Sequence, residues 1–332
     1  MRWGSVTARL ILLALGVALA LLVSVRVGAV SIPLPEIVAA LRGEGDPVTA
    51  TIVRELRLPR ALQAALVGAA LAVSGATFQA LLRNPLAEPY ILGVSGGAAV
   101  GAVAAIVLGF AFVAGWAIPM AAFAGALLAI VLVLRIAASV GRALDTRILL
   151  LAGVVVGAFF NACILLVLTL AEVESFRSAV FWMMGSFAGA TWPETGLLAL
   201  YLLPGILLLL GLARALNLFS VGEETAAYLG TRVERTKMLA YGTASLLAAA
   251  AVAVSGVIGF VGLIVPHMIR LGWSGDYRFL LPASALLGAT LLVLVDALAR
   301  VAAAPGELPV GVVTAFVGVP VFVWLLRREV AA

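Results

Sequence analysis

The chain has 332 residues, of which 64% are hydrophobic and only 11% are charged, and its mean hydropathy is +1.21. A soluble domain of this length could not bury so much apolar surface, so the composition predicts a polytopic membrane protein. The apolar runs are long and continuous rather than short and alternating, which favours helices over strands. The positive-inside bias of membrane proteins accounts for the net charge of +5. We therefore expect the chain to lie in a lipid bilayer and not to bind nucleic acid.

Ten apolar segments follow one another along the chain. The first, Leu10 to Val25, begins like a signal peptide, but it is long and further spans follow it, so we expect an uncleaved helix. The polar region after it is expected to hold a short surface helix at Glu36 to Leu41. The segment at 258–272 is short and Pro266 interrupts it, so a full crossing there stays open. The other eight segments lie at 57–82, 91–113, 115–135, 147–170, 194–213, 234–254, 278–299 and 308–326.

This pattern predicts an all-α membrane protein with about ten transmembrane helices in one domain, 1–332. Ten crossings place both termini on the same side of the membrane. With the N-terminus in the cytoplasm, 14 of the 21 basic residues are cytoplasmic, which is the orientation that the positive-inside rule favours. Arg54, Arg57 and Arg60 form a cluster on the other side and are a local exception to this rule.

A short repeat links two distant segments. The tetrapeptide Ala-Val-Ser-Gly occurs at 72–75 and again at 253–256, and a proline follows each glycine after ten residues. The second and seventh helices are five crossings apart, so they run in opposite directions, as the halves of an inverted repeat must. The match predicts an inverted repeat of helices 2–5 and 7–10, although four small residues also coincide by chance.

Residues that carry catalysis or bind cofactors are scarce. Lys237 is the only lysine and no glycine-rich phosphate loop precedes it, which excludes a P-loop ATPase. His267 and Cys163 are single, which excludes a zinc site built on several such ligands within one chain. We therefore expect a chain that is not an enzyme and that binds neither metal nor cofactor. His267 and the pair Met183 and Met184 are interpreted as packed side chains, and a haem-ligand role for the methionines stays as an alternative.

The longest polar stretch on the cytoplasmic side runs from Asn217 to Lys237. Ser220 with Glu223 three residues later has the spacing of a capping box, and Gly230 supplies a helix stop. The prediction is a short helix on the membrane surface with an apolar face of Ala226, Ala227 and Leu229. It serves either as an ordinary connector or as a docking helix for a cytoplasmic partner.

Five stretches carry a resemblance that spans almost the whole chain in natural order. They are RLPR at 57–60, NPLAEPYILGVSGGA at 84–98, GEETAAYLG at 222–230, GFVGLIVPHMIRL at 259–271 and ELPVGVVTAFVGVPVFVWLL at 307–326. The chain thereby resembles the FecCD-type permease subunits of bacterial ABC importers for iron-siderophores, haem and vitamin B12. The resemblance implies the type II importer permease fold, a homodimer, two cytoplasmic ATPase subunits that bind ATP and Mg²⁺, an extracytoplasmic binding protein, and a place in the bacterial cytoplasmic membrane.

The resemblance also implies roles for individual residues. Binding-protein docking falls on Arg57, Arg60 and Arg300, with pairing inside the chain, such as Arg300 with Asp296, as the alternative. The cytoplasmic gate falls on Asn84, Leu86, Asp145 and Thr146. A helix-ending turn at Asn84 coexists with this role, and Asp145 departs from the small hydroxyl residue expected there and is predicted to pair with Arg142 or Arg147. Coupling to the ATPase falls on the 217–237 region, at Gly222, Glu223, Glu224, Ala227, Leu229 and Gly230.

The function implied is ATP-driven import of an iron complex, a ferric siderophore, by alternating access at the interface of two identical subunits. Haem and vitamin B12 are alternative cargoes for the same type of importer. A proton-coupled secondary transporter is a more distant alternative, which would need ionisable residues in mid-membrane. Asp296 and Glu307 lie towards the outer ends of their helices, so the sequence offers little support for it. A membrane-embedded enzyme lacks a catalytic grouping.

Overall fold

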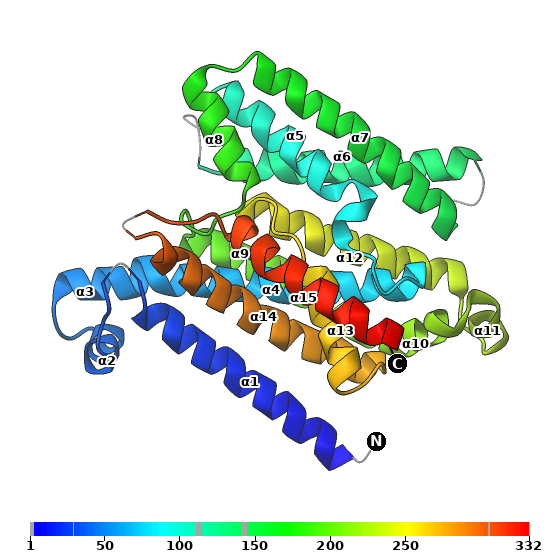
Figure 1. Cartoon of the computed structure of the whole chain (residues 1–332), viewed down its shortest axis with the longest axis horizontal. Helices are drawn as coiled ribbons and strands as arrows, with labels where there is room; N and C mark the ends of the chain where they lie inside the picture. Colours follow the sequence, from blue (N-terminus) through cyan, green and yellow to red (C-terminus); the bar gives the residue numbers. More distant parts are fainter. Residues whose placement is uncertain (1–2, 29, 111–114, 141–144, 305, 332) are drawn as a thin grey trace.

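The computed structural model describes residues 3–28, 30–110, 115–140, 145–304 and 306–331 and is built of helices, with no strand within those ranges (Figure 1). Seven helices are long and apolar enough to cross a membrane by length and composition. They are α1 (Trp3–Arg26), α4 (Leu58–Leu82), α6 (Ala117–Val140), α7 (Thr146–Thr169), α9 (Trp192–Gly211), α12 (Val233–Ser255) and α14 (Tyr277–Ala302). Three shorter apolar helices join them: α5 (Val94–Val107), α13 (Val261–Gly272) and α15 (Val310–Ala331). These helices match the ten predicted segments in order, which confirms the predicted fold class.

Two of the predicted boundaries are wrong, one because a turn cuts the apolar run and the other because the helix begins earlier than predicted. The segment predicted at 91–113 begins as a 3₁₀ turn (η2, Pro89–Leu92), and α5 starts only after Gly93, which has φ +75°. The helix predicted from residue 57 is preceded by α3 (Pro47–Thr51) and a π-helical turn, η1 (Ile52–Arg57), so helix runs continuously from Pro47 to Leu82. Asp46 starts it by accepting a hydrogen bond from Thr49 N at 2.8 Å, with proline at the first helical position.

Two short helices flank the spans at one end. The predicted surface helix at 36–41 is confirmed as α2 (Leu34–Arg42). Ile37 and Ala40 of α2 pack with Val53 and with Val25 of α1 in a small separate core. The amphipathic α8 (Val173–Met183), which follows α7, was not predicted from the sequence.

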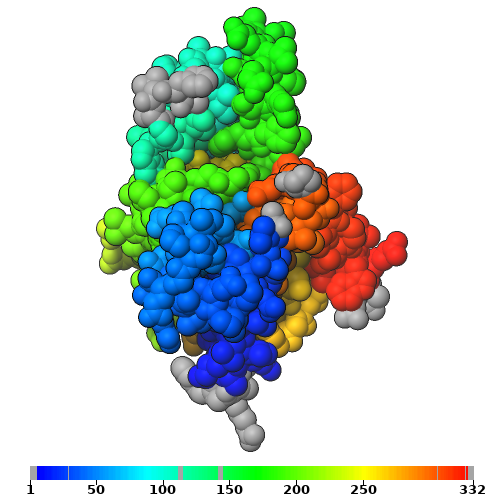
Figure 2. Space-filling view, turned by 90° about the vertical axis from the view of Figure 1, so that its left-hand side faces the viewer, coloured from blue at the N-terminus to red at the C-terminus, as the bar shows by residue number. Residues whose placement is uncertain are grey.

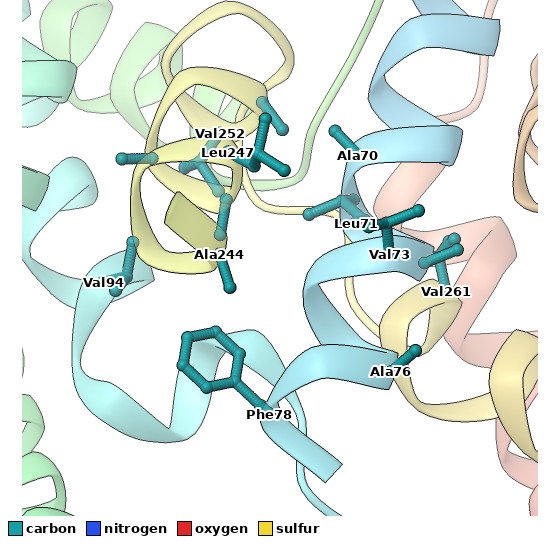
Figure 3. Packing of buried hydrophobic residues seen from close by; sticks show 14 of the residues in the cluster. Ala70, Leu71, Val73, Ala76, Phe78, Val94, Ala244, Leu247, Val252 and Val261 are labelled. Atoms are coloured by element: carbon teal, nitrogen blue, oxygen red, sulfur yellow. The ribbon is translucent and has the colours of Figure 1, made fainter. Parts of the chain in front are cut away.

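Helix α4 is the centre of the packing. It contacts α14, α12, α13 and α9 (Figure 1). Most of its side chains are buried. Figure 3 shows Leu71 and Phe78 of α4 facing α12, and the Phe78 ring meets Tyr241 edge-on at 5.8 Å between centroids. A Cβ on Gly75 would overlap the carbonyl oxygen of Gly262 in α13, so only glycine permits this approach. The helix therefore forms a rigid connection between its neighbours.

The helices pack as expected of an inverted repeat, because the first helix of each half contacts the second and third helices of the other half. Helix α4 packs on α13 and α14, whereas α12 packs on α5 and α6, and α4 and α12 run in opposite directions (Figure 1). The repeated tetrapeptide does not mark equivalent positions, because α4 continues past Gly75 to Leu82 but α12 ends at Ser255, before Gly256 with φ +68°. The arrangement of helices, rather than the four matched residues, supports the repeat.

The two ends of the helix array differ in what they hold. The α11 end holds α10 (Ala213–Val221), α11 (Glu223–Tyr228), the start of α1 and the end of α15 (Figure 1). The α2 end holds α2, α3 and the connection from α14 to α15, and Figure 2 looks onto it with residues 31–57 in blue beside that connection in orange. The start of α1 and the end of α15 thus lie on the same side of the array, as an even number of crossings requires (Figure 1).

Candidate functional site

Arg60 is the centre of a charge cluster at the α2 end. Its Nε lies 3.1 Å from both carboxylate oxygens of Asp296, and its Nη2 lies 2.9 Å from Asp296 Oδ1. The other side of the guanidinium faces Glu307, with Nη1 to Oε1 at 3.0 Å and Nη2 to Oε2 at 2.8 Å. Arg60 thus binds two carboxylates, one from α14 and one from the segment before α15. Planar, bidentate pairs of this kind are strong and fix orientation.

Arg300 belongs to the same cluster. Its Nε lies 3.3 Å from Asp296 Oδ2, as an ion pair without hydrogen-bond alignment. Its Nη2 donates to the hydroxyl of Ser24 at 2.8 Å and to the Ser24 carbonyl at 2.9 Å. The pairing of Arg300 with Asp296 inside the chain, an alternative that the sequence left open, is therefore confirmed.

Arg57 fixes the end of the first helix. Its Nη1 donates to the carbonyls of Val25 at 2.8 Å and Arg26 at 3.0 Å, and its Nη2 donates to the carbonyl of Val30. These are carbonyls at and beyond the last turn of α1, which have no partner within the helix. Arg57 thus ties α1 to the start of α4.

The three predicted docking arginines lie at one end of the molecule, but each already has partners. Their exposed fractions are 8% for Arg57, 9% for Arg60 and 6% for Arg300. Desolvated charges are tolerated only when they are paired or hydrogen-bonded. Arg60 and Arg300 are paired with Asp296, and Arg57 is held by hydrogen bonds to backbone carbonyls. Their docking role stays a prediction, and a docking partner would meet Arg60 only through its edge beside Glu307.

The predicted gate residues lie together at the α11 end. Asn84 Oδ1 accepts from Leu86 N at 2.9 Å, which forms a tight turn after α4, and Leu86 is 39% exposed. Thr146, the first residue of α7, donates from Oγ1 to the carbonyl of Leu81 at 3.4 Å. This contact joins the start of α7 to the end of α4.

Asp145 contacts Arg147, one of its two predicted partners, but through the backbone N–H of that residue. Its carboxylate accepts from the backbone N–H of Arg147 at 2.9 Å and of Ile148 at 3.4 Å, so it caps the N-terminus of α7. The predicted alternative partner Arg142 lies outside the described residues. The carboxylate is explained by helix capping, which favours aspartate as strongly as a hydroxyl residue.

Two predicted gate residues, Asp145 and Thr146, and one predicted coupling residue, Glu223, line one cavity of about 640 Å³ at the α11 end. Its walls come from the α4–α5 turn, the start of α7, and α11 with α12. They are lined by Arg83, Asp145, Thr146, Arg147, Glu223, Val233, Glu234 and Lys237. A movement of α11 therefore acts on the same space that the gate segments enclose.

The coupling region forms a short helix, as predicted, but it starts and faces differently. Gly222 rather than Ser220 precedes the first turn of α11, and the Ser220 hydroxyl instead donates to the Asn217 carbonyl at 2.7 Å, so the predicted capping box is wrong. Gly230 follows the helix with φ +82°, which confirms the predicted stop. The predicted apolar face is wrong in part, because Ala226 is buried while Ala227 is exposed.

The exposed surface of α11 has both apolar and acidic character. Tyr228 and Leu229 are 91% and 65% exposed, and Glu224 is exposed beside them. Glu223 is tied back by an ion pair with Lys237 of α12 at 2.7 Å, and the Lys237 side chain is only 6% exposed. The lysine therefore connects α11 to the long helix behind it.

Sequence reasoning missed Glu88, between α4 and η2. Its Oε1 accepts from the backbone N–H of Phe260 at 2.7 Å, at the start of α13, and the adjacent Tyr90 hydroxyl donates to the Ile258 carbonyl at 2.9 Å. Phe260 has φ +70°, which is rare for a residue with a side chain. The signal available was an acidic residue within a long uncharged stretch. These contacts join the two broken segments that precede α5 and α13.

The remaining candidates have mixed outcomes. His267 is 3% exposed, which confirms it as a packed residue. The core interpretation of the methionines is wrong for Met184, which is 37% exposed. Met183 and Met184 line an open groove of about 340 Å³ together with residues of α15 and of the segment before α13, among them Phe316 and Phe260.

Comparison with known proteins gives consistent results along the whole chain. A model of the FecCD transport family matches residues 15–328. The uncharacterized ABC transporter permease protein YvrB of Bacillus subtilis (strain 168) is 41% identical over 322 residues, which cover 94% of this chain and 91% of YvrB. The vitamin B12 import system permease protein BtuC of Salmonella paratyphi A is 44% identical over 277 residues, which cover 83% of this chain and 84% of BtuC.

Solved structures agree with this assignment. An inward-facing conformation of a metal-chelate type ABC transporter superposes with a TM-score of 0.87 at 33% identity and covers 96% of this chain and 98% of that one. PsaBC from Streptococcus pneumoniae, solved with a Fab, has a TM-score of 0.61 at 17% identity over 83% of this chain and 93% of that one, which shows a shared fold alone. With a family model over nearly its full length and relatives above 40% identity, this chain belongs to the FecCD transport family and is an ABC importer permease of the BtuC type.

Proposed function

We propose that this permease works as a homodimer in the bacterial cytoplasmic membrane, with both termini in the cytoplasm. Two cytoplasmic ATPase subunits bind ATP and Mg²⁺, and an extracytoplasmic binding protein delivers the cargo. The chain itself binds no cofactor and hydrolyses no ATP. Its cargo is an iron complex of the ferric-siderophore class, which passes by alternating access between the two copies.

The placement of charged and exposed groups at opposite ends of α4 carries this proposal. The arginine cluster lies at the start of α4, and the gate turn at Asn84 follows its last residue, Leu82. Lys237 and α11 lie beside that turn, around the shared cavity. One end is suited to an acidic protein partner, and the other to a partner that pushes on α11.

The gate in this proposal consists of matching segments from both copies. Leu86 is exposed and supplies an apolar side chain, whereas Asn84 and Thr146 are neutral. Such groups can close a passage without retaining a charged ligand. In this proposal, one transport cycle uses the docking arginines, the gate residues and the α11 surface in turn.

Vitamin B12 is the second candidate cargo, because relatives at 44% identity are named as vitamin B12 import permeases. The ferric-siderophore assignment is supported by the structural likeness to a transporter of the metal-chelate type. Uptake of a radiolabelled ferric siderophore, haem and cobalamin into proteoliposomes that hold the complete transporter separates the three. Cobalamin uptake without siderophore uptake would replace the first assignment by the second.

Assembly with an ATPase tests the importer class itself. The purified permease is expected to be inert toward ATP, and the complex with its ATPase is expected to hydrolyse ATP faster when the binding protein is added. A mutation in the ATPase nucleotide site should abolish uptake although a proton gradient is present. Uptake that persists in that mutant and collapses with the gradient would favour a proton-coupled secondary transporter instead.

The docking helix has its own test at Ala227, which is exposed on α11. Replacing Ala227 with arginine places a bulky cation on the surface that meets the ATPase, and we expect the ATPase to dissociate or its hydrolysis to become uncoupled from uptake. The matched control is Ala215→Arg on α10, one helix away and only partly buried. Normal coupled transport by the Ala227 variant would argue against the docking role.

A further inference from the structure

The two carboxylates that bind Arg60 differ in their exposure and in their other partners. Asp296 has no exposed surface and is also paired with Arg300, whereas the Glu307 side chain is 41% exposed. Within the described part of the chain, Arg60 is the only group that forms an ion pair with Glu307. Asp296 therefore anchors the guanidinium from inside, and Glu307 covers its outward edge.

Four of the five N–H donors of Arg60 are in use, and the fifth is a lone proton of Nη1, which by itself cannot hold a carboxylate in bidentate fashion. Nε and one proton of Nη2 are directed at Asp296, and Nη1 with the other proton of Nη2 is directed at Glu307. A guanidinium has five donors in a fixed planar fork, so a third carboxylate cannot bind in bidentate fashion until one of the two leaves. Only Glu307 can leave into solvent.

We infer that Glu307 occupies the place of a partner's carboxylate and is exchanged for it when an acidic protein docks at the α2 end. This inference rests on the docking role proposed for Arg60. In the undocked permease, Glu307 neutralises Arg60 and competes with the partner. In the docked complex, an aspartate or glutamate of the partner takes over the outward edge, and Arg60 stays held by Asp296.

The exchange has a consequence for α15. Glu307 lies in the connection between α14 and α15, where Leu308 N donates to the Ala299 carbonyl at 3.0 Å. The next contacts are from Val310 N to the Gly185 carbonyl at 2.9 Å and from Gly311 N to the Met184 carbonyl at 3.0 Å. Release of Glu307 removes the ion pair that holds this connection to α4. Docking at Arg60 thereby loosens the start of α15, which lies beside the groove at Met184.

Glu307→Gln is the variant that tests the exchange. It keeps the shape of the side chain and removes the charge that competes for Arg60. A purified binding protein that docks on the wild-type permease–ATPase complex serves as the probe, and its dissociation constant is measured by biolayer interferometry. Because partly exposed pairs are weak and the bidentate geometry adds to them, we expect docking to tighten by about two- to tenfold.

The matched control is Glu55→Gln, since Glu55 is an exposed carboxylate near the same end. It reports the general effect of removing one negative charge near an acidic partner, which long-range electrostatics predicts to be small at physiological salt. Tightening in the Glu307 variant beyond that of the Glu55 variant supports the exchange. Equal affinity in both variants, or weaker docking in the Glu307 variant, overturns it.

Arg60→Gln separates the inference from the proposal beneath it. If this variant, checked for folding by size-exclusion chromatography, weakens docking while Glu307→Gln does not strengthen it, the exchange is wrong and the docking role stands. If neither variant changes the dissociation constant of the binding protein, Arg60 has no docking role and the proposed exchange is wrong as well. We expect docking affinity to fall in Arg60→Gln and to rise in Glu307→Gln.

Discussion

Asp296 is predicted to be the residue of the α2 end on which stability depends most. Asp296→Asn keeps the volume of the side chain but removes its charge and places an amide N–H₂ among guanidinium donors. The carboxylate is fully buried and accepts from Arg60 at 2.9 and 3.1 Å, with Arg300 at 3.3 Å. Among the described residues, Arg60 would then keep only Glu307 as an ion-pair partner, and Arg300 would lose the carboxylate that it pairs with. Breaking a buried pair from one side costs about 3–5 kcal/mol, so we expect a loss of that size.

The measurement is the free energy of unfolding in mixed micelles, from titration with a denaturing detergent and with helix content as the signal. Glu307→Gln is the control, because its partly exposed pair should contribute no more than about 1 kcal/mol. Combining Asp296→Asn with Arg60→Met should cost less than the sum of the two single changes, since each change alone leaves the other partner unpaired. A loss below about 1 kcal/mol for Asp296→Asn would refute the reasoning that this cluster is held by the buried carboxylate.

Three further predictions concern other parts of the chain. Gly75→Ala should lower the unfolding temperature, because a methyl there meets the backbone of α13, whereas Gly157→Ala, with open space around it, should not. Lys237→Met should break the ion pair with α11 and leave ATP hydrolysis intact while uptake falls severalfold, measured together in proteoliposomes. Burial by itself would raise the pKa of Asp276, but hydrogen bonds from Asn217 and from a backbone N–H outweigh it and lower the pKa below 3.8. The stabilisation by Asp276 is therefore present above about pH 4 and lost as pH falls through the lowered pKa, and Asp276→Asn should flatten this acid limb of the unfolding temperature.

The helices could be predicted because the membrane leaves the backbone little choice. A bilayer requires every backbone group to be paired within its own segment, so apolar length alone marks a helix. The same argument does not reach α8, whose Glu174 and Arg177 break the apolar signal. It also does not place helix ends inside an apolar run, where a residue such as Gly93 turns the chain.

The sequence predicted where the site residues lie along the helices, but not which residues they contact. The sequence placed Arg60 at the outer end of a helix, yet its partners are 236 and 247 residues away, and only the packing of α14 on α4 brings them together. Residue types equally fail to distinguish a gate residue from a helix cap at Asp145, because both roles favour a small polar side chain. Local spacing suggested Ser220 as a cap, but the backbone turns at Gly222 instead.

The contacts around α4 determine how a signal could cross the molecule. A helix packed through glycine against α13 and α14 has little room to slide past them, because its neighbours' backbones lie in direct contact. It can only move with them as a body or stay fixed while others move. The less constrained elements are α11, tied to α12 by Lys237, and the connection before α15, tied to α4 by Glu307. Since each of these ties includes an ion pair with a partly exposed glutamate, we expect that both can break at modest cost. We therefore expect the parts that move to lie at the two ends, with α4 as the support between them.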